Sequence, residues 1–276
     1  MFNLKINDLA VIRISLLISV VAAIFSTGVF HADEHYQILE FAGLKMGTTT
    51  PEQLPWEYAH QIRPALQPAV VVGMSKIVSM LWEFDPFVLT MLLRLLAMGL
   101  AFMGTWMLYA YYEPKIEGTA FKKSFLLLSF LLWFIVFTRV RFSSENISGA
   151  LFIIGYVLAL KPTSGLFKNW IFTGFVLGLA TIVRFQTGIL ILGLIAWLIF
   201  VQKMPMKNFF FLTFGGCLAL IIGILIDRWF YGDWVLTSWN YFESNILHDR
   251  ASAFGTNPWW QYLADMFITL IPPFSI

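Results

Sequence analysis

A series of long apolar runs, separated by short polar connections, is the feature that most constrains how this chain folds. Most of the runs approach the roughly 20 residues that a helix needs to cross a bilayer. Hydrophobic residues make up 59% of the 276-residue sequence and charged residues only 12%, whereas a soluble domain has roughly 25% charged residues. The sequence therefore predicts an all-α polytopic membrane protein, with apolar runs at residues 9–30, 64–83, 87–112, 121–138, 147–160, 169–184, 187–201 and 208–230.

The first run is too long for the core of a signal peptide, and AAIFSTG is a poor cleavage site. Lys5 and Arg13 lie at its start, so we expect an uncleaved span with a cytoplasmic N-terminus. Three later connections carry lysines, at residues 113–123, 161–168 and 202–207. Because cytoplasmic loops are enriched in Lys and Arg, we place these three in the cytoplasm. The polar stretches whose side chains are able to bind or react with a substrate then share the opposite, outer face. They are residues 31–63, 139–146, 184–187 and 231–262.

This orientation limits how the second and third runs cross. The chain leaves residue 63 outside and reaches residue 113 inside, so only one of the runs 64–83 and 87–112 spans fully. Run 64–83 is the more polar and contains two prolines, so we expect it to lie in or dip into the outer interface. The alternative is an ordinary hairpin whose turn, residues 82–86, lies inside.

The first reading gives about seven crossings. The first outer loop is then residues 31–63, or up to 86, and the last outer loop is residues 231–262. We expect one membrane module over residues 1–276. The apolar ending TLIPPFSI suggests the N-terminal part of a longer chain.

The first outer loop opens with VFHADEHYQILEFA, which places Asp33 and Glu34 directly after a span. The low dielectric near the boundary raises a carboxylate pKa toward the range of a general base. If His35–Phe41 is helical, Tyr36, Leu39 and Phe41 are expected on the bilayer and Asp33, Gln37 and Glu40 outward. The alternative is that these charges simply end the span. His31 and His35 have a spacing seen in zinc sites, but no further cluster supports a metal, and we expect none.

Arginines recur on the outer side, which basic residues usually avoid. Arg63 precedes an apolar run and is either a lipid-phosphate ligand or an interfacial anchor. Arg139 and Arg141 begin a short connection in which Ser144, further along, is a candidate helix cap. Arg184 lies between two apolar runs, where an ionisable residue is a functional candidate. Further candidates for substrate contacts on this face are His31, Gln37, Trp56, Glu57, Glu145, His248 and Asp249.

The sequence argues against a nucleic-acid partner and excludes an internal disulfide bond. The net charge of +2, with no basic run interleaved with aromatic residues, argues against nucleic acid. Cys217 is the only cysteine, so the chain forms no internal disulfide.

Five stretches together resemble glycosyltransferase family 22 in order and approximate spacing: HADEHYQILEFA, LPWEYAHQIRPALQP, TRVRFSSENISG, IVRFQTG and FGTNPWWQY. These enzymes are alpha-mannosyltransferases that use lipid-phosphate mannose, and the SSEN form looks more like their bacterial relatives. The resemblance covers the N-terminal half of the family pattern. It implies the GT-C membrane architecture, with a long first outer loop that carries an Asp or Asp-Glu pair.

The resemblance also implies a reaction and roles for residues. An acceptor hydroxyl attacks the sugar with inversion while a polyprenyl phosphate departs, with Asp33 as base and Glu34 as its neighbour. Arg63, Arg139, Arg141 and Arg184 are the candidates to neutralise the phosphate, and no metal or other cofactor is required. The implied partners are a polyprenyl-phosphate sugar donor, a glycan or glycolipid acceptor and membrane lipids. The implied location is the bacterial inner membrane, or the endoplasmic reticulum membrane in a eukaryote, with the active site on the periplasmic or lumenal face.

Two other classes of function fit the same residues. A transporter or flippase of an anionic lipid would use the arginines but would not need Asp33 as a base. A non-catalytic fragment or scaffold would fit the apolar ending.

Overall fold

The computed structural model describes residues 6–29, 31–81, 83–161, 167–250, 252 and 255–270, and every regular element within these ranges is helical. Four helical segments are long and apolar enough to cross a membrane, at Asp8–Phe25, Pro86–Lys115, Thr119–Arg139 and Met206–Tyr231. Four shorter apolar helices accompany them: α4 (Leu66–Leu81), α8 (Ser144–Leu160), α9 (Phe167–Val183) and α10 (Thr187–Phe200). The prediction of an all-α polytopic membrane protein is confirmed.

The long segments contain α1 (Ile6–Phe25), α5 (Pro86–Tyr112), the pair α6 (Thr119–Leu131) and α7 (Trp133–Arg139), and α11 (Met206–Tyr231). The first helix ends at Phe25, short of the predicted residue 30. Leu132 separates α6 from α7 in an extended conformation, with ψ of 126°. The Glu113–Lys115 turn, η3, follows α5. Lys5, Trp82, part of the 161–168 connection and the last six residues lie outside the described ranges.

Helix ends follow local sequence signals. Asp85 caps α5 by accepting from the Phe87 backbone N–H at 2.7 Å, with Pro86 in the first turn. Ser143 caps α8 by accepting from the Asn146 backbone N–H at 3.2 Å. The cap is therefore Ser143, one residue before the predicted Ser144. Gly232 ends α11 with a φ of 86°, which glycine adopts without steric cost.

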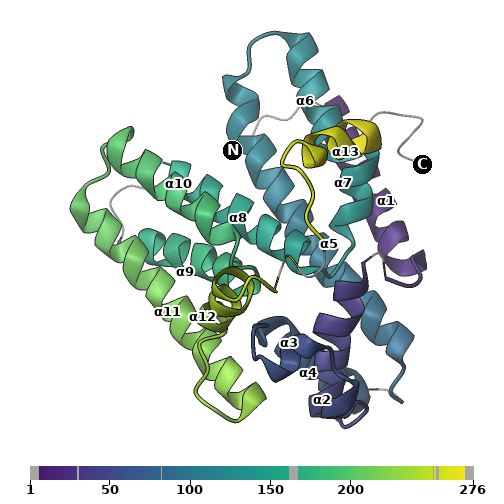
Figure 1. Ribbon diagram of the computed structural model, residues 1–276. Helices are drawn as coiled ribbons and strands as arrows, with labels where there is room; N and C mark the ends of the chain where they lie inside the picture. Colours follow the sequence, from purple (N-terminus) through teal and green to yellow (C-terminus); the bar gives the residue numbers. More distant parts are fainter. Residues whose placement is uncertain are drawn as a thin grey trace.

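The spans form two packed groups that α8 connects. Figure 1 shows α8 to α11 together on the left and α1, α5, α6 and α7 on the right, with the short elements of the first outer loop below them. Helix α8 packs against both α5 and α9. The tightest pair is α9 with α11, where Gly174 and Gly215 lie against backbone of the opposite helix. Small residues allow such close approach in membrane helices.

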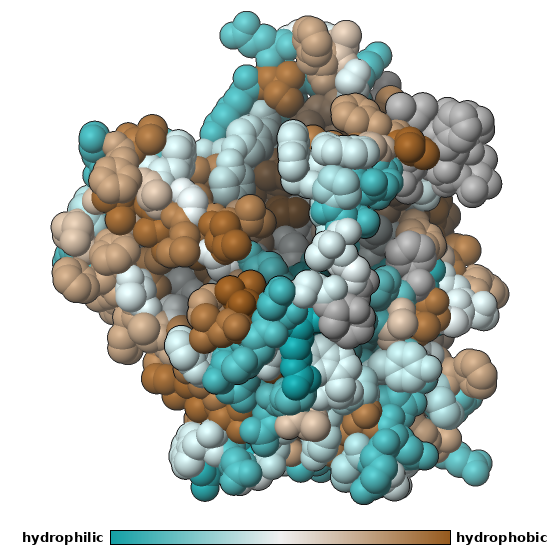
Figure 2. Space-filling view, in the orientation of Figure 1, coloured by the Kyte–Doolittle hydropathy of each residue, from teal (hydrophilic) through white to brown (hydrophobic). Residues whose placement is uncertain are grey.

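The predicted first outer loop is mostly helical. It contains η1 (Glu34–Leu39, a π-helical stretch), α2 (Glu40–Met46), η2 (Pro51–Gln53) and α3 (Trp56–Ala59). The last predicted outer loop contains α12 (Thr237–Phe242) and η4 (Glu243–Leu247), and α13 (Gln261–Leu270) follows it. Hydrophilic residues form a band from the centre to the lower edge of Figure 2, over α2, α3 and α12, while hydrophobic residues cover the left side over α9 to α11.

The expected bilayer-facing side of the first outer helix is wrong at Phe41. This side chain is fully buried, with its ring stacked 5.7 Å from the ring of Phe230 and edge-on to Tyr58. Gln37 and Glu40, expected to face outward, instead bond to Glu57 and Thr49. The reason is tertiary: α3 and the end of α11 cover this helix, and a local amphipathic pattern does not reveal such cover.

Candidate functional site

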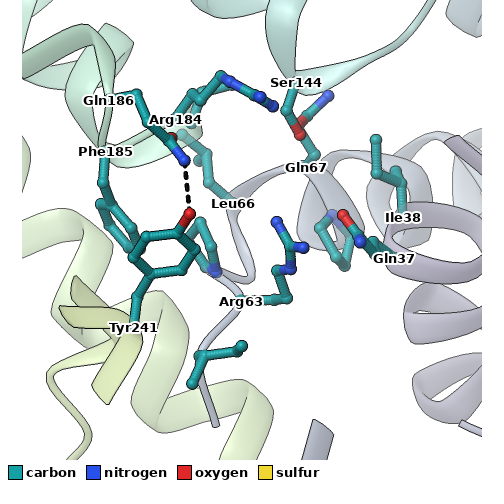
Figure 3. A pocket seen from close by; sticks show the side chains of 14 residues that line it. Gln37, Ile38, Arg63, Leu66, Gln67, Ser144, Arg184, Phe185, Gln186 and Tyr241 are labelled. Carbon is teal, nitrogen blue, oxygen red and sulfur yellow. Dashed lines mark hydrogen bonds between the residues drawn. The ribbon is translucent and has the colours of Figure 1, made fainter. Parts of the chain in front are cut away.

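The outer stretches singled out in the sequence converge on one narrow cleft, which we call the central cleft. Figure 3 shows Arg63 near its middle, with Phe185, Gln186 and Tyr241 on one side and Gln37 on the other. The cleft has a volume of about 20 Å³, close to the space of a single water molecule. Its polar lining comes from η1, the segment before α4, the start of α8, the α9–α10 connection and α12: Gln37, Arg63, Gln67, Ser144, Arg184, Gln186 and Tyr241.

Arg63 is held in the cleft by a carboxylate from α3. The Glu57 Oε1 atom accepts hydrogen bonds from Gln37 Nε2 at 3.2 Å and from Arg63 Nη2 at 3.4 Å. The Glu57 Oε2 atom and the Arg63 Nε atom are buried and have no hydrogen-bond partner. Buried polar groups normally find partners, so this trio retains capacity to bind a polar ligand.

The backbone around Arg63 is fixed by residues of α11 that the motif analysis missed. Tyr231 donates from its hydroxyl to the Arg63 carbonyl oxygen at 2.7 Å. Asp227 accepts from the Ala65 N–H at 2.7 Å and, through its other oxygen, from the Thr237 hydroxyl at 2.8 Å. A carboxylate inside the apolar run 208–230 is the signal that could have found Asp227.

The other wall of the cleft is joined by side-chain bonds between distant stretches. Ser144 donates to Gln67 Oε1 at 2.7 Å, and Gln186 Nε2 donates to the Tyr241 hydroxyl at 2.7 Å. Arg184 forms an ion pair with Glu145. These bonds bring together the outer stretches 139–146, 184–187 and 231–262.

A second and larger space, the α5–α8 cavity, has a volume of about 650 Å³ and lies beside the cleft. Glu145 lines this cavity, and its partner Arg184 lines the central cleft, so the pair stands between the two spaces. The remaining polar residues around it come from the start of the first outer loop, α6, α7, the α7–α8 connection and the first turn of α8: His31, Glu34, Ser129, Thr138, Arg139, Arg141, Ser143 and Asn146. A volume of this size is typical of small-molecule sites.

The two candidate carboxylates differ in environment. The Asp33 side chain is 42% exposed, and its Oδ1 lies 3.6 Å from His31 Nδ1. Glu34 is buried, lines the α5–α8 cavity and attracts Arg94 of α5 electrostatically. Arg94 also donates to the carbonyl oxygens of Ser26 and Gly28, just beyond the end of α1.

The adjacent arginines Arg139 and Arg141 point to different surroundings. The Arg139 guanidinium donates to the hydroxyls of Ser15 and Ser19 in α1, each at 3.1 Å, and the residue is 1% exposed. Arg141 is partly exposed, and its guanidinium lies 4.5 Å from the ring centroid of Phe137. Its buried Nε atom has no hydrogen-bond partner. Asn146 fixes both arginines by donating to their backbone carbonyls at 3.1 and 2.8 Å.

Four candidate substrate residues line neither space. Glu57 is one of them, although it bonds to Gln37 and Arg63 at the central cleft. Trp56 lies in α3 with the His60 ring edge-on to it, and the Arg250 guanidinium is 5.5 Å from the indole centroid. His248 lies 3.8 Å from Glu243 on an exposed turn. Asp249 has a φ of 46° and accepts from the Ser252 hydroxyl.

The two outer histidines do not share a ligand set. His35 Nε2 lies 3.1 Å from Glu40 Oε1, whereas His31 faces Asp33. Within the described ranges, no group of three or more His, Cys, Asp or Glu side chains is placed to hold a metal ion.

The comparisons with known proteins lead to the same family that the sequence motifs resemble. The profile of the Alg9-like mannosyltransferase family matches residues 11–276. The chain is 27% identical to mannosyltransferase APTG1 of Arabidopsis thaliana, over 93% of the chain and 48% of that protein. It is 25% identical to GPI alpha-1,2-mannosyltransferase 3 of Danio rerio, over 98% of the chain and 50% of that protein. The chain thus spans about half the length of these relatives. No solved structure matches it significantly.

Proposed function

The chain belongs to the Alg9-like mannosyltransferase family, and from that premise we propose that the protein transfers mannose from a polyprenyl-phosphate donor to a hydroxyl group of a glycan or glycolipid acceptor. The reaction proceeds with inversion at the outer face of the membrane, periplasmic in a bacterium or lumenal in a eukaryote. One observation carries the proposal: arginines from three distant stretches line two adjoining spaces, the central cleft and the α5–α8 cavity, and Glu34, next in sequence to Asp33, lines the cavity with them.

In this reaction, the acceptor oxygen forms a bond to the anomeric carbon of the sugar. The bond from that carbon to the phosphate oxygen breaks, and its electron pair leaves with the polyprenyl phosphate. The acceptor proton passes to a carboxylate of the protein, which acts as general base. Fixed cations near the departing phosphate stabilise the charge that develops there.

We assign the base to Asp33 and a supporting role to Glu34. The Asp33 side chain is 42% exposed and is therefore reachable by an acceptor that arrives from water. The Glu34 side chain is buried and attracts Arg94, so it is better suited to orient its surroundings than to exchange protons with an incoming hydroxyl. His31 Nδ1 accepts from the Asp33 backbone N–H at 3.2 Å and lies 3.6 Å from Asp33 Oδ1, so His31 is positioned to orient the base.

The phosphate is assigned to Arg63, Arg141 and Arg184. Arg63 and Arg184 line the central cleft, and Arg141 lines the α5–α8 cavity. Arg139 was also a candidate from the sequence, but its guanidinium is enclosed by Ser15 and Ser19. We therefore give Arg139 a structural role in joining α7 to α1.

Acceptor contacts are assigned to the cleft rim and to the surface next to it. Gln37, Glu57 and Glu145 present polar groups at the cleft and the cavity. Trp56 offers an aromatic face beside the Arg250 guanidinium, which suits a sugar ring. His248 and Asp249 remain proposals for the outer edge of an acceptor site.

A transfer assay with the natural full-length protein in membranes tests this function. Radiolabelled polyprenyl-phosphate mannose is supplied, and wild type is compared with Asp33→Asn and Glu34→Gln for both donor binding and transfer. Loss of a general base lowers turnover by about 100-fold or more, so Asp33→Asn is expected to bind donor and transfer almost nothing. Glu52→Gln is the matched control, because Glu52 is an exposed carboxylate of the same outer loop.

Equal transfer by wild type and Asp33→Asn would refute the base assignment, and a selective loss in Glu34→Gln would move that role to Glu34. If wild type moves labelled lipid across vesicle bilayers without transferring sugar, the protein is a flippase or transporter. If it does neither, the chain acts as a non-catalytic scaffold.

A further inference from the structure

The walls of the α5–α8 cavity change from polar to apolar along its length. Its wall on α5 consists of Ala101, Thr105 and Leu108, which lie on one helical face. The Thr105 hydroxyl donates to the Ala101 carbonyl oxygen of the same helix, so this wall offers mainly carbon atoms. The facing wall on α8 runs from Glu145 through Gly149 to Ile153. Eight residues of helix span about 12 Å, so the cavity extends well past the polar connection between α7 and α8. Small side chains on both helices leave this space open.

Two arginines line the polar end of this cavity, and neither forms an ion pair within the described residues. Arg139 is bonded to the hydroxyls of Ser15 and Ser19, which leaves Arg141 as the candidate for a ligand. Among the described residues, Arg63 pairs with Glu57 and Arg184 pairs with Glu145, whereas no ion pair involves Arg141. The buried Nε atom of Arg141 has no hydrogen-bond partner. The Arg141 side chain is partly exposed and lines the cavity, and an arginine fork matches a phosphate group.

We propose that the α5–α8 cavity holds the first isoprene units of the lipid donor, with Arg141 contacting the phosphate at its polar end. This inference rests on the proposed function, since it places that donor. One phosphate on an apolar chain fits both features together: the cation receives the anion, and the apolar walls receive the chain. Glu34 and His31 line the same polar end, next in sequence to Asp33, so the sugar on the phosphate lies near the assigned base.

A rival groove exists between α4 and α11, with a volume of about 470 Å³. It is also lined by apolar residues and one cation, Lys76. It lacks the carboxylates and the arginines that line the α5–α8 cavity. It serves below as the comparison site.

Glycines provide matched variants, because a Cβ at Gly149, Gly73 or Gly193 would meet no atom within 4 Å. Gly149 lines the α5–α8 cavity, Gly73 lines the rival groove, and Gly193 is exposed on α10. Gly149→Leu, Gly73→Leu and Gly193→Leu therefore introduce the same side chain into an apolar helix and differ in which space it fills.

The measurement is KM and kcat for two mannosyl-phosphate donors in the natural full-length protein, one with the natural polyprenyl chain and one with a methyl group in its place. Gly149→Leu is expected to raise KM for the long-chain donor about tenfold or more, since several buried methylenes lose their site, and to change KM for the short donor much less. Gly193→Leu and Gly73→Leu are expected to match wild type. Arg141→Gln is expected to raise KM for both donors, because both carry the phosphate, and Arg141→Lys is expected to restore part of the affinity.

A binding readout separates this inference from the proposed function. A polyprenyl phosphate with a photoreactive group on its second isoprene unit is expected to label peptides of α5, α7 and α8 in wild type, and less so in Gly149→Leu. If labelling follows this pattern but no mannose is transferred, the proposed function fails and the lipid site stands. If transfer proceeds and Gly149→Leu matches Gly193→Leu in KM and labelling, the cavity assignment is overturned.

Labelling that is lost in Gly73→Leu instead would place the lipid chain in the rival groove. Should Gly149→Leu fail to fold, Ala101→Leu fills the same cavity from α5.

Discussion

Asp227 is the residue on which the geometry around Arg63 most depends. It satisfies the Ala65 N–H and the Thr237 hydroxyl at once, and it thereby joins α11 to the segment before α4 and to α12. Asp227→Ala is expected to destabilise the protein by about 1–3 kcal/mol, because it leaves a buried backbone donor without a partner. Thermal unfolding of the purified protein in detergent measures this change.

Asp227→Asn is the informative control for this prediction. The amide oxygen still accepts from Ala65, and the amide NH₂ donates to the Thr237 oxygen, so most of the stability is expected to remain. If Asp227→Ala unfolds at the same temperature as Asp227→Asn, the hydrogen bonds of Asp227 are not what holds Arg63 in place.

Residue types were predictable from the sequence, but residue roles were not. Arg139 and Arg141 are two positions apart, and the sequence treats them alike. Helix α7 ends at Arg139, and both arginines line the α5–α8 cavity, but the Arg139 guanidinium is bonded to serines of α1 whereas that of Arg141 lies against Phe137. Only the exact end of the helix and the serines of a distant span decide this difference. Arg94 was not singled out from the sequence, although it donates to two carbonyl oxygens just beyond the end of α1.

At the scale of helices, the contact between α9 and α11 is set by glycines. A Cβ at Gly215 would collide with the carbonyl oxygen of Ile171, and one at Gly174 with that of Leu212. These obstacles are backbone atoms, which cannot move aside without separating the helices. Gly215→Ala is therefore expected to lower stability by about 1–3 kcal/mol or more, despite alanine's better helix propensity.

Gly193→Ala is the matched control, because its added Cβ would meet no atom. Its stability is expected to equal or slightly exceed that of wild type. The yield of monodisperse protein and the unfolding temperature of both variants test this pair. Equal values for Gly215→Ala and Gly193→Ala would mean that α9 and α11 are less closely packed than described.

The apolar runs located most helices correctly. The predicted runs 147–160 and 187–201 correspond to α8 and α10, whose ends differ by at most three residues. The break at Leu132 between α6 and α7 was not predicted, since neither proline nor glycine marks it. The orientation of the first outer helix was predicted wrongly at Phe41, since that ring is covered by Phe230, far along the chain. Burial by a residue that is distant in the sequence cannot be predicted from the local periodicity of apolar residues.

At the scale of the whole molecule, the outer stretches lie together although they are distant in sequence. Gln37 and Tyr241 line the same cleft, and Asn240 donates to the carbonyl oxygens of His60 and Gln61. The lysine-based orientation placed all of these stretches on one face, and their convergence is consistent with that placement. Which membrane side this face meets stays a prediction, and so does the number of crossings.

Cysteine labelling tests both the membrane side of this face and the number of crossings. Cys217 is the only cysteine, so Cys217→Ser provides a background without thiols. On that background, Glu52→Cys in the first outer loop is expected to react with a membrane-impermeant maleimide in sealed, outside-out vesicles, and Glu117→Cys is expected to react only after the membrane is permeabilised. Both glutamates are exposed, so access differs by side of the membrane alone. The reverse pattern would invert the whole topology.

Glu83→Cys then decides whether α4 crosses. Glu83 is exposed and lies between α4 and the cap of α5. If α4 lies in the outer interface, residue 83 stays outside, and we expect it to react in intact vesicles as residue 52 does. Helix α4 has 16 residues and, at about 1.5 Å per residue, is shorter than the roughly 30 Å hydrocarbon core. Labelling only after permeabilisation would instead make α4 and α5 a hairpin with an inner turn. Since α5 would then return to the outer side, the lysine connection after it would lie outside, so Glu117→Cys must change sides together with Glu83→Cys for that topology to hold.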